Sequence, residues 1–206
     1  MILSTAATML AEMPVAALSL NELSRRVGLA KSNVLRYFET REAVLLELLD
    51  SAWREWLDAL AAELSGEATT DPVADRAERV ATAIVRTLVD RPMLCELASA
   101  SSAVLERNIS VEVAARFKRA TLADLDALAR LVRGVVPELD DVAGQRFAVA
   151  VVLMGGSVWA ATQPSAAMQA AYEADCTLRA RWLEFDEALH ELLATLLLGL
   201  LARSPR

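Results

Sequence analysis

The side chains best suited to chemistry lie between Ser19 and Thr40, in the segment SLNELSRRVGLAKSNVLRYFET. Cationic, amide and hydroxyl groups gather there on both sides of a single glycine, Gly28. Donor groups on a short helix that follows a glycine turn are what reading the edges of DNA bases in the major groove requires. The segment therefore predicts a nucleic-acid-binding unit. A helical hairpin with a merely solvated charged face is the alternative reading of the same residues.

The sequence contains no comparable group of residues suited to catalysis. His190 is the only histidine, and its neighbours Glu187 and Glu191 favour a helix-surface ion pair over an acid–base pair. Cys95 and Cys176 are too few for a metal site or a disulfide framework, and we expect buried apolar roles for them. The sequence also holds no glycine-rich phosphate loop and no GxSxG elbow. We expect neither an enzyme nor a cofactor.

Two short helices must position the donor groups. Ser19 followed by Glu22 has capping-box spacing, in which the hydroxyl accepts from a first-turn N–H and the carboxylate reaches back to the N–H of residue 19. Gly28 marks the end of this helix, because glycine tolerates the left-handed exit conformation. A second helix is predicted from about Lys31 to Phe38.

Charge is distributed unevenly along the chain. The 206 residues carry a net charge of −7, yet residues 1–41 hold five basic and three acidic side chains, a net +2. The other 165 residues therefore carry −9. Phosphate repulsion prevents such an acidic body from binding DNA over its whole surface. Binding is expected at the basic tip alone.

The segment from about Leu3 to Leu49 resembles the N-terminal domain of TetR-family transcriptional regulators. The matching residues are Ala6, Ala7, Leu10, Ala11, Ser19, Leu20, Leu23, Gly28, Lys31, Ser32, Tyr37, Phe38, Thr40, Arg41 and Glu42. The resemblance covers the first quarter of the chain, whereas the rest matches only in length and helical layout. It implies that Thr40 opens a long fourth helix whose N-terminus approaches a phosphate.

The same resemblance assigns residues to DNA contacts. Base edges and nearby phosphates would be met by Lys31, Ser32, Asn33 and Arg36. The DNA backbone would be held by Ser19, Arg25, Tyr37, Thr40 and Arg41.

Several positions depart from the family pattern. Ala30 replaces a frequent capping serine or threonine, Leu35 replaces a common tyrosine, and Pro14 replaces a frequent glycine. Asn33 replaces a frequent threonine and can read adenine through its amide. The sequence begins within the first helix, without the basic arm that often precedes it. We expect either a natural start upstream or weak DNA binding.

Composition predicts an all-α chain of about nine or ten helices. Aliphatic residues and alanine are abundant, and there are only seven glycines and six prolines. A three-helix helix-turn-helix domain is predicted over residues 1–45, and a helical effector-binding and dimerisation bundle over 46–206. The apolar runs 148–161 and 192–201 are shorter than the ~20 residues that cross a bilayer. A cytoplasmic protein without membrane contact is expected.

Two C-terminal helices are expected to form a homodimer. The segment VAVVLMGGSVWAA, residues 149–161, is apolar nearly all round, and the last helix, residues 177–202, is rich in leucine. A four-helix bundle made with the partner's copies would bury both, although an intramolecular core explains them as well. The predicted interface residues are Val152, Gly155, Gly156, Leu189, Leu193 and Leu196.

A ligand pocket is the third element that the resemblance implies. The middle helices would enclose a small, hydrophobic effector with large apolar side chains and a few polar ones. The predicted lining is Trp53, Trp56, Met93, Glu96, Leu97, Phe117, Phe147, Met154 and Trp159, with Asn108 and Gln145 as further polar contacts. An aromatic and methionine stripe of this kind is also typical of an ordinary core.

The sequence therefore predicts a homodimeric, ligand-responsive DNA-binding transcriptional regulator, with repression as the expected mode. A bound effector would favour a conformer whose two reading heads are wrongly spaced for a palindromic operator. The alternative is an all-α dimeric adaptor or ligand-binding protein that does not bind specific DNA.

Overall fold

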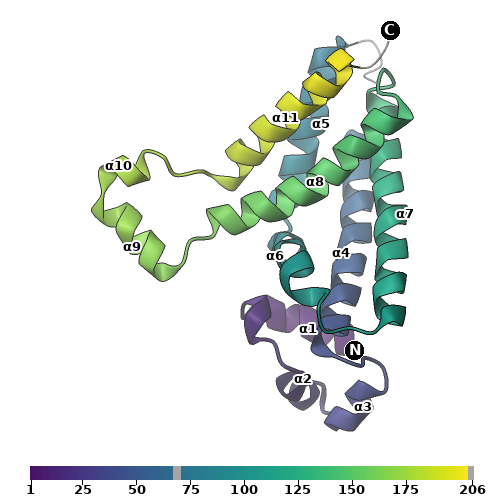
Figure 1. Ribbon diagram of the computed structural model, residues 1–206, viewed down its shortest axis with the longest axis vertical. Helices are drawn as coiled ribbons and strands as arrows, with labels where there is room; N and C mark the ends of the chain where they lie inside the picture. The colour runs from purple at the N-terminus through teal and green to yellow at the C-terminus, as the bar shows by residue number, and fades with distance from the viewer. Residues whose placement is uncertain (67–70, 204–206) are drawn as a thin grey trace.

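The computed structural model describes residues 1–66 and 71–203, and in these ranges all regular structure is helical (Figure 1). A small head of three helices sits at one end of a bundle of longer ones. The head contains α1 (Ile2–Leu10), a 3₁₀ turn η1 (Val15–Ala17), α2 (Leu20–Val27) and α3 (Lys31–Leu35). The all-α, two-part architecture predicted from the sequence is confirmed.

The helix boundaries of the head follow local capping rules. Ser19 Oγ accepts from Glu22 N at 3.2 Å, and Gly28 ends α2 with φ +74°. The Glu22 carboxylate does not complete the expected capping box, because it accepts instead from Arg25 and Arg26. Ala30 occupies the N-cap position of α3. Its methyl group cannot accept a hydrogen bond, so α3 has no side-chain cap.

The body is a bundle around two long helices. Its elements are α4 (Arg41–Leu64), α5 (Val73–Val89), α6 (Pro92–Ala100), the π turn η2 (Ser101–Leu105), α7 (Val111–Val135), α8 (Asp141–Thr162), α9 (Ala166–Ala174), α10 (Cys176–Arg179) and α11 (Phe185–Arg203). Side-chain oxygens of Thr40, Ser110 and Asp140 accept from the first turns of α4, α7 and α8. The start of α4 after Thr40 agrees with the sequence prediction.

The predicted final helix does not run unbroken over 177–202, because residues 180–184 leave helical geometry between α10 and α11. α6 gives way to a π turn at Ser101, and α5 begins at Val73 with Pro72 as its N-cap residue.

The body core is centred on α4, α5 and α8. Trp56 is completely buried, and its Nε1 donates to Thr87 Oγ1 at 2.9 Å, which satisfies the indole inside an apolar interior. Phe147 of α8 is equally buried. Among the described residues, α8 is the one helix long and apolar enough to cross a membrane, and it packs here against α6, α7 and α11. It is longer than the apolar run expected from the sequence.

Helices α9 and α10 form an arm that stands off the bundle. The arm leaves the end of α8, turns back through α10 and rejoins the bundle at α11 (Figure 1). Neither α9 nor α10 contains a buried residue. Tyr172 and Trp182 pack edge-to-face across the arm with ring centroids 4.8 Å apart, so the arm has ordered packing of its own.

Candidate DNA-binding head and effector cavity

Five polar side chains predicted to contact DNA share one exposed surface of the head. Lys31, Ser32 and Asn33 occupy the first turn of α3, and Arg36 and Tyr37 follow its end. Tyr37 is 74% exposed, whereas Val34 on the opposite side of α3 is fully buried. In the part of the chain that the structure describes, none of these five side chains forms a hydrogen bond or ion pair. We call these five residues the reading face.

The remaining four predicted contact residues already have partners. The hydroxyls of Ser19 and Thr40 accept from the N–H groups of Glu22 and Ala43, which leaves each hydroxyl hydrogen able to donate to a phosphate. Arg25 is exposed and binds both carboxylate oxygens of Glu22. Hydrogen bonds from Arg25 and then from Arg26 lower the pKa of Glu22 to about 2.

Arg41 holds the head together rather than pointing outward. Its Nη1 donates to the carbonyls of Ala16 and Leu18 at 3.1 and 3.2 Å, and its Nε donates to Glu42. This guanidinium joins the start of α4 to the segment before α2. The prediction that Arg41 contacts the DNA backbone stays a prediction, since Nη2 of the guanidinium makes no hydrogen bond within the described part of the chain.

Two carboxylates fasten the head to the body. Glu96 of α6 accepts from Val15 N at 2.8 Å, and Glu39 accepts from Ser110 N at 2.6 Å at the start of α7. Glu96 was predicted to line the pocket, and that prediction is wrong because its carboxylate faces η1 of the head. α6 is therefore a second body helix, after α4 with Arg41, that holds the head through a side chain.

A cavity of about 400 Å³ lies between α4, α6, η2, α7 and α8, in the half of the bundle nearer the head. Two of the predicted lining residues, Trp53 and Phe117, are on its wall. Sequence reasoning missed the others, which include Lys118, Thr121 and Leu125 of α7. The recurrence of Phe117, Thr121 and Leu125 at helical spacing was the available signal. We call this space the head-side cavity.

The rest of the predicted pocket lining lies elsewhere. Trp56, Leu97 and Phe147 are fully buried core residues, so they present no surface to a ligand. Met93 and Met154 pack half-buried against the core outside the cavity wall, and Trp159 packs edge-to-face on Phe185 with centroids 5.1 Å apart. Gln145 binds Asp126, and Asn108 is exposed. The aromatic stripe is thus mainly core, which was the alternative reading.

The mouth and inner end of the head-side cavity carry charge. At the mouth, Lys118 Nζ pairs with Glu106 at 3.0 Å. Asp124 borders a narrow recess that shares Trp53 and Thr121 with the cavity. Burial, with a contribution from Asp50, raises the pKa of Asp124 to about 6. The cavity wall itself thus carries the ion pair of Lys118 and Glu106, and Asp124 lies in the adjoining recess.

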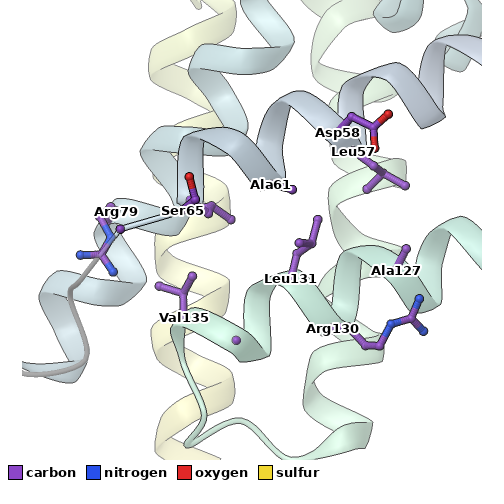
Figure 2. A pocket seen from close by; sticks show the side chains of 12 residues that line it. Leu57, Asp58, Ala61, Ser65, Arg79, Ala127, Arg130, Leu131 and Val135 are labelled. Atoms are coloured by element: carbon purple, nitrogen blue, oxygen red, sulfur yellow. The ribbon is translucent and has the colours of Figure 1, made fainter.

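A second cavity of about 470 Å³ lies at the end of the bundle away from the head. Figure 2 shows its walls, with Ala61 and Ser65 on the α4 side across from Leu131 and Val135 of α7, and Arg79 of α5 at one side. No residue of α6 or of the head lines it. A ligand there would contact α4, α5 and α7 but not α6.

Sequence comparison decides the family. Residues 2–48 match the family described as "Bacterial regulatory proteins, tetR family", and residues 50–204 match "Tetracyclin repressor-like, C-terminal domain". The chain belongs to the TetR family. It is accordingly a ligand-responsive DNA-binding transcriptional regulator of the kind that acts as a dimer, and members of this family are not enzymes. No protein of curated function matches it in sequence.

Solved structures share the TetR-family fold over nearly the whole chain. The fatty acid degradation regulator FadR from Bacillus halodurans is 18% identical, with 96% of each chain covered and a TM-score of 0.58. A TetR regulator from Rhodococcus sp. RHA1 is 14% identical over 99% of this chain and 95% of that one, with a TM-score of 0.59. FadR from Bacillus subtilis, solved with stearoyl-CoA, is 13% identical over 95% of each chain, with a TM-score of 0.57.

The predicted dimer residues of this TetR-family chain are mostly internal. Leu189 and Leu193 are fully buried against the body, and Gly155 is buried as well. Gly156 faces α6, where an added Cβ would lie 3.2 Å from the backbone at Ala98 and Ser99. These four assignments are corrected, since the single chain already covers the residues.

The outer sides of the same two helices remain apolar and exposed. Half-exposed Val152 lines the head-side cavity, and Leu196 is half-buried. Exposed apolar positions that the sequence prediction missed are Val142, Val149 and Leu153 of α8 and Leu192 and Leu198 of α11. We call these five residues the outer face.

His190 has a different partner from the one expected. Its Nε2 lies 3.1 Å from Glu78 Oε1 and 3.2 Å from Thr82 Oγ1, both on α5. Neither Glu187 nor Glu191 pairs with it in the part of the chain that the structure describes. The ring links α11 to α5.

Proposed function

We propose that this protein is a cytoplasmic repressor that binds a palindromic operator as a homodimer and releases it when a small apolar effector enters the head-side cavity. The observation that carries the DNA-binding part is the reading face. Its polar side chains point outward from α3 without internal partners, as base-reading groups must. Arg36 and Asn33 are the strongest candidates for base contacts, and Tyr37, Ser19, Thr40 and Arg25 would hold phosphates.

We propose that residues 1–45 bind DNA and that residues 46–206 bind the effector and form the dimer. α4 runs continuously through this boundary, so no flexible linker separates the two parts. Movement of the body can therefore be passed to the head through a rigid helix.

The effector is proposed to act through α6. Ala98 and Ser99 at the end of α6 line the head-side cavity, and Glu96 in the same helix holds Val15 of the head. A ligand that displaces the end of α6 also displaces this hydrogen bond. Operator release follows if the ligand binds the displaced conformer more tightly.

An acyl thioester is the effector class to test first. The cavity walls are mainly apolar, with Trp53, Phe117 and Leu125 among them, and Lys118 stands at the mouth where an anionic group would lie. The similar fold of Bacillus subtilis FadR was solved with stearoyl-CoA. Cavities of about 300–1,000 Å³ are usual for small ligands.

Selection from a random double-stranded DNA pool tests the operator proposal. We expect enrichment of a palindrome, and the replacement Arg36→Ala should weaken binding to it by about 1–3 kcal/mol. Arg119→Ala, which removes an exposed arginine from α7, is the matched control and should bind as the wild type does. Failure of soluble dimer to enrich any sequence would favour the adaptor alternative.

Cavity-filling variants test the effector proposal with stearoyl-CoA as the probe. Leu125 lines the head-side cavity and Leu131 lines the cavity at the other end of α7. We expect stearoyl-CoA to release operator DNA from the wild type and from Leu131→Trp, but not from Leu125→Trp. If stearoyl-CoA instead releases operator DNA from the wild type and from Leu125→Trp but not from Leu131→Trp, the effector site lies in the other cavity. No release from any of the three proteins would reject acyl thioesters as effectors.

A further inference from the structure

Asp124 of α7 carries a carboxyl group that has no partner inside the protein. Its side chain is half-buried, yet it forms no hydrogen bond or ion pair in the part of the chain that the structure describes. The charged neighbours that act on it are Asp50 and Arg54 of α4, and Arg54 is already bound to Asp50. A half-buried acceptor of this kind costs free energy unless water or a ligand supplies a hydrogen.

The Asp124 carboxyl lines a narrow recess that adjoins the head-side cavity. The recess has a volume of about 10 Å³ and shares Trp53, Thr121, Leu125 and Val152 with the cavity. A space of this size holds about one water molecule, or one oxygen or nitrogen atom of a ligand. A ligand in the cavity can therefore place a single polar group beside Asp124 while its apolar part stays among the apolar side chains.

The carboxyl and hydroxyl groups of the recess can only accept hydrogen bonds. The hydroxyl of Thr121 donates its hydrogen to the carbonyl oxygen of Phe117 at 3.0 Å, so its own oxygen is left as an acceptor. Burial raises the pKa of Asp124 only to about 6, so its carboxyl is ionised at pH 8 and has no hydrogen to donate. The indole of Trp53 also lines the recess, but it does not donate to Asp124. A ligand group that fits here must bring its own hydrogen.

We propose that Asp124 is a specificity residue of the head-side cavity, which favours effectors that carry a hydrogen-bond donor, a hydroxyl or an amine, over effectors that carry none. This inference rests on the proposed effector cavity and adds a polar requirement to it. A hydroxyl or ammonium group supplies the hydrogen that Asp124 lacks, whereas an ether or a methyl group displaces water and leaves the carboxylate without a donor. Among acyl thioesters, those whose chain bears such a donor are preferred.

Three small probes of similar length test this preference at pH 8. Octan-1-ol and heptyl methyl ether are isomers, but only the alcohol has a hydrogen to donate, and octylamine brings a protonated amine. Calorimetry gives the dissociation constant of each probe in the absence of DNA. We expect the alcohol and the amine to bind the wild type at least about tenfold more tightly than the ether, which is the size of effect expected from a hydrogen bond to a charged acceptor.

Substitutions on α7 assign the preference to the recess. Asp124→Leu removes the carboxylate and should abolish the preference for donors. Asp126→Leu is the matched control, because Asp126 is exposed, binds Gln145 and lines neither the recess nor the cavity, so this variant should keep the preference. Thr121→Val removes the second acceptor and should reduce the preference by about threefold. Circular dichroism establishes that each variant is folded.

The possible results distinguish this inference from the proposed function. Equal affinity of the wild type for all three probes, with binding lost in Leu125→Trp, keeps the cavity as a ligand site and overturns the role of Asp124. A preference for donors that survives in Asp124→Leu overturns it as well. If no probe binds the wild type, the effector cavity and this inference fail together, whereas operator selection still tests DNA binding. Loss of the preference in Asp124→Leu and its retention in Asp126→Leu support the inference.

Discussion

Two arginines of the head have opposite surroundings. Arg36 is exposed and its side chain makes no hydrogen bond or ion pair within the described part of the chain, whereas Arg41 binds two carbonyls and Glu42. The structure therefore separates a residue available for DNA from one that supports the head. Residue type and position in the family pattern could not distinguish them.

Removing the Arg41 clamp should lower stability. In Arg41→Ala the carbonyls of Ala16 and Leu18 lose their charged donor, and we expect the free energy of unfolding to fall by about 1–3 kcal/mol. Urea titration followed by circular dichroism measures this change. Arg36→Ala should leave the same titration unaltered. Equal stability of the two variants would show that the clamp contributes nothing.

The raised pKa of Asp124 predicts that the stability of the protein depends on pH. Because its pKa is raised from an ordinary value of 3.8 to about 6, the folded protein binds more protons than the unfolded chain between these values. Its contribution to stability therefore falls as pH rises from about 4 to 6. At pH 8, Asp124→Asn should be more stable than the wild type by roughly 1 kcal/mol, after allowance for solvent screening.

Unfolding of Asp124→Asn and the wild type at pH 4 and pH 8 checks the sign. We expect the advantage of the variant to shrink at pH 4, where the wild-type carboxyl is protonated in the folded state and no longer carries a buried charge. An advantage of the same size at both pH values would mean that the burial of Asp124 has no electrostatic cost.

Among the elements, α3 is short and lacks a side-chain cap. Ala30 stands at its N-cap with extended backbone, ψ 143°, which suits a capping hydroxyl. Ala30→Ser should let the new oxygen accept from Asn33 N and raise the unfolding free energy by about 0.5–1 kcal/mol. Ala30→Val adds bulk without an acceptor and should give no gain. If Ala30→Val raised the free energy of unfolding as much as Ala30→Ser does, capping would be excluded as the cause.

The contact of α6 with α8 depends on one of two adjacent glycines. A Cβ at Gly156 would lie 3.2 Å from backbone atoms of α6, whereas a Cβ at Gly155 meets only Leu88 Cδ1 at 3.9 Å. We expect Gly156→Ala to destabilise the protein by about 1–3 kcal/mol and Gly155→Ala to stabilise it by about 1 kcal/mol. Thermal unfolding of the pair measures both effects. If both substitutions changed the stability in the same direction, the close approach of α6 to α8 at Gly156 would be contradicted.

At the scale of the whole molecule, the outer face predicts where two chains meet. Leu153 on α8 and Leu122 on α7 are 64% and 61% exposed, but only Leu153 belongs to the outer face. Leu153→Arg should convert the dimer to monomer in sedimentation experiments, because a charge would be buried at the interface. Leu122→Arg should stay dimeric. A monomeric Leu122→Arg would place the interface on α7.

Much of the fold was predictable because its signals are local. Ser19, Thr40, Ser110 and Asp140 cap helices within a few residues of themselves, and Gly28 ends α2 through its own backbone conformation. The all-α class and the family resemblance of the first quarter rest on such short-range patterns. These features need no knowledge of what packs against them.

Tertiary structure alone decided which apolar residues form core, cavity or outer face. Trp53 and Trp56 lie three residues apart on one helix, yet one lines the cavity and the other is fully buried against Thr87. Glu96 was available for a ligand by its type, but the approach of η1 uses it to hold the head. The sequence by itself determined the helices and the basic tip. Packing between distant segments decided the rest, because a side chain's role depends on neighbours that sequence spacing does not specify.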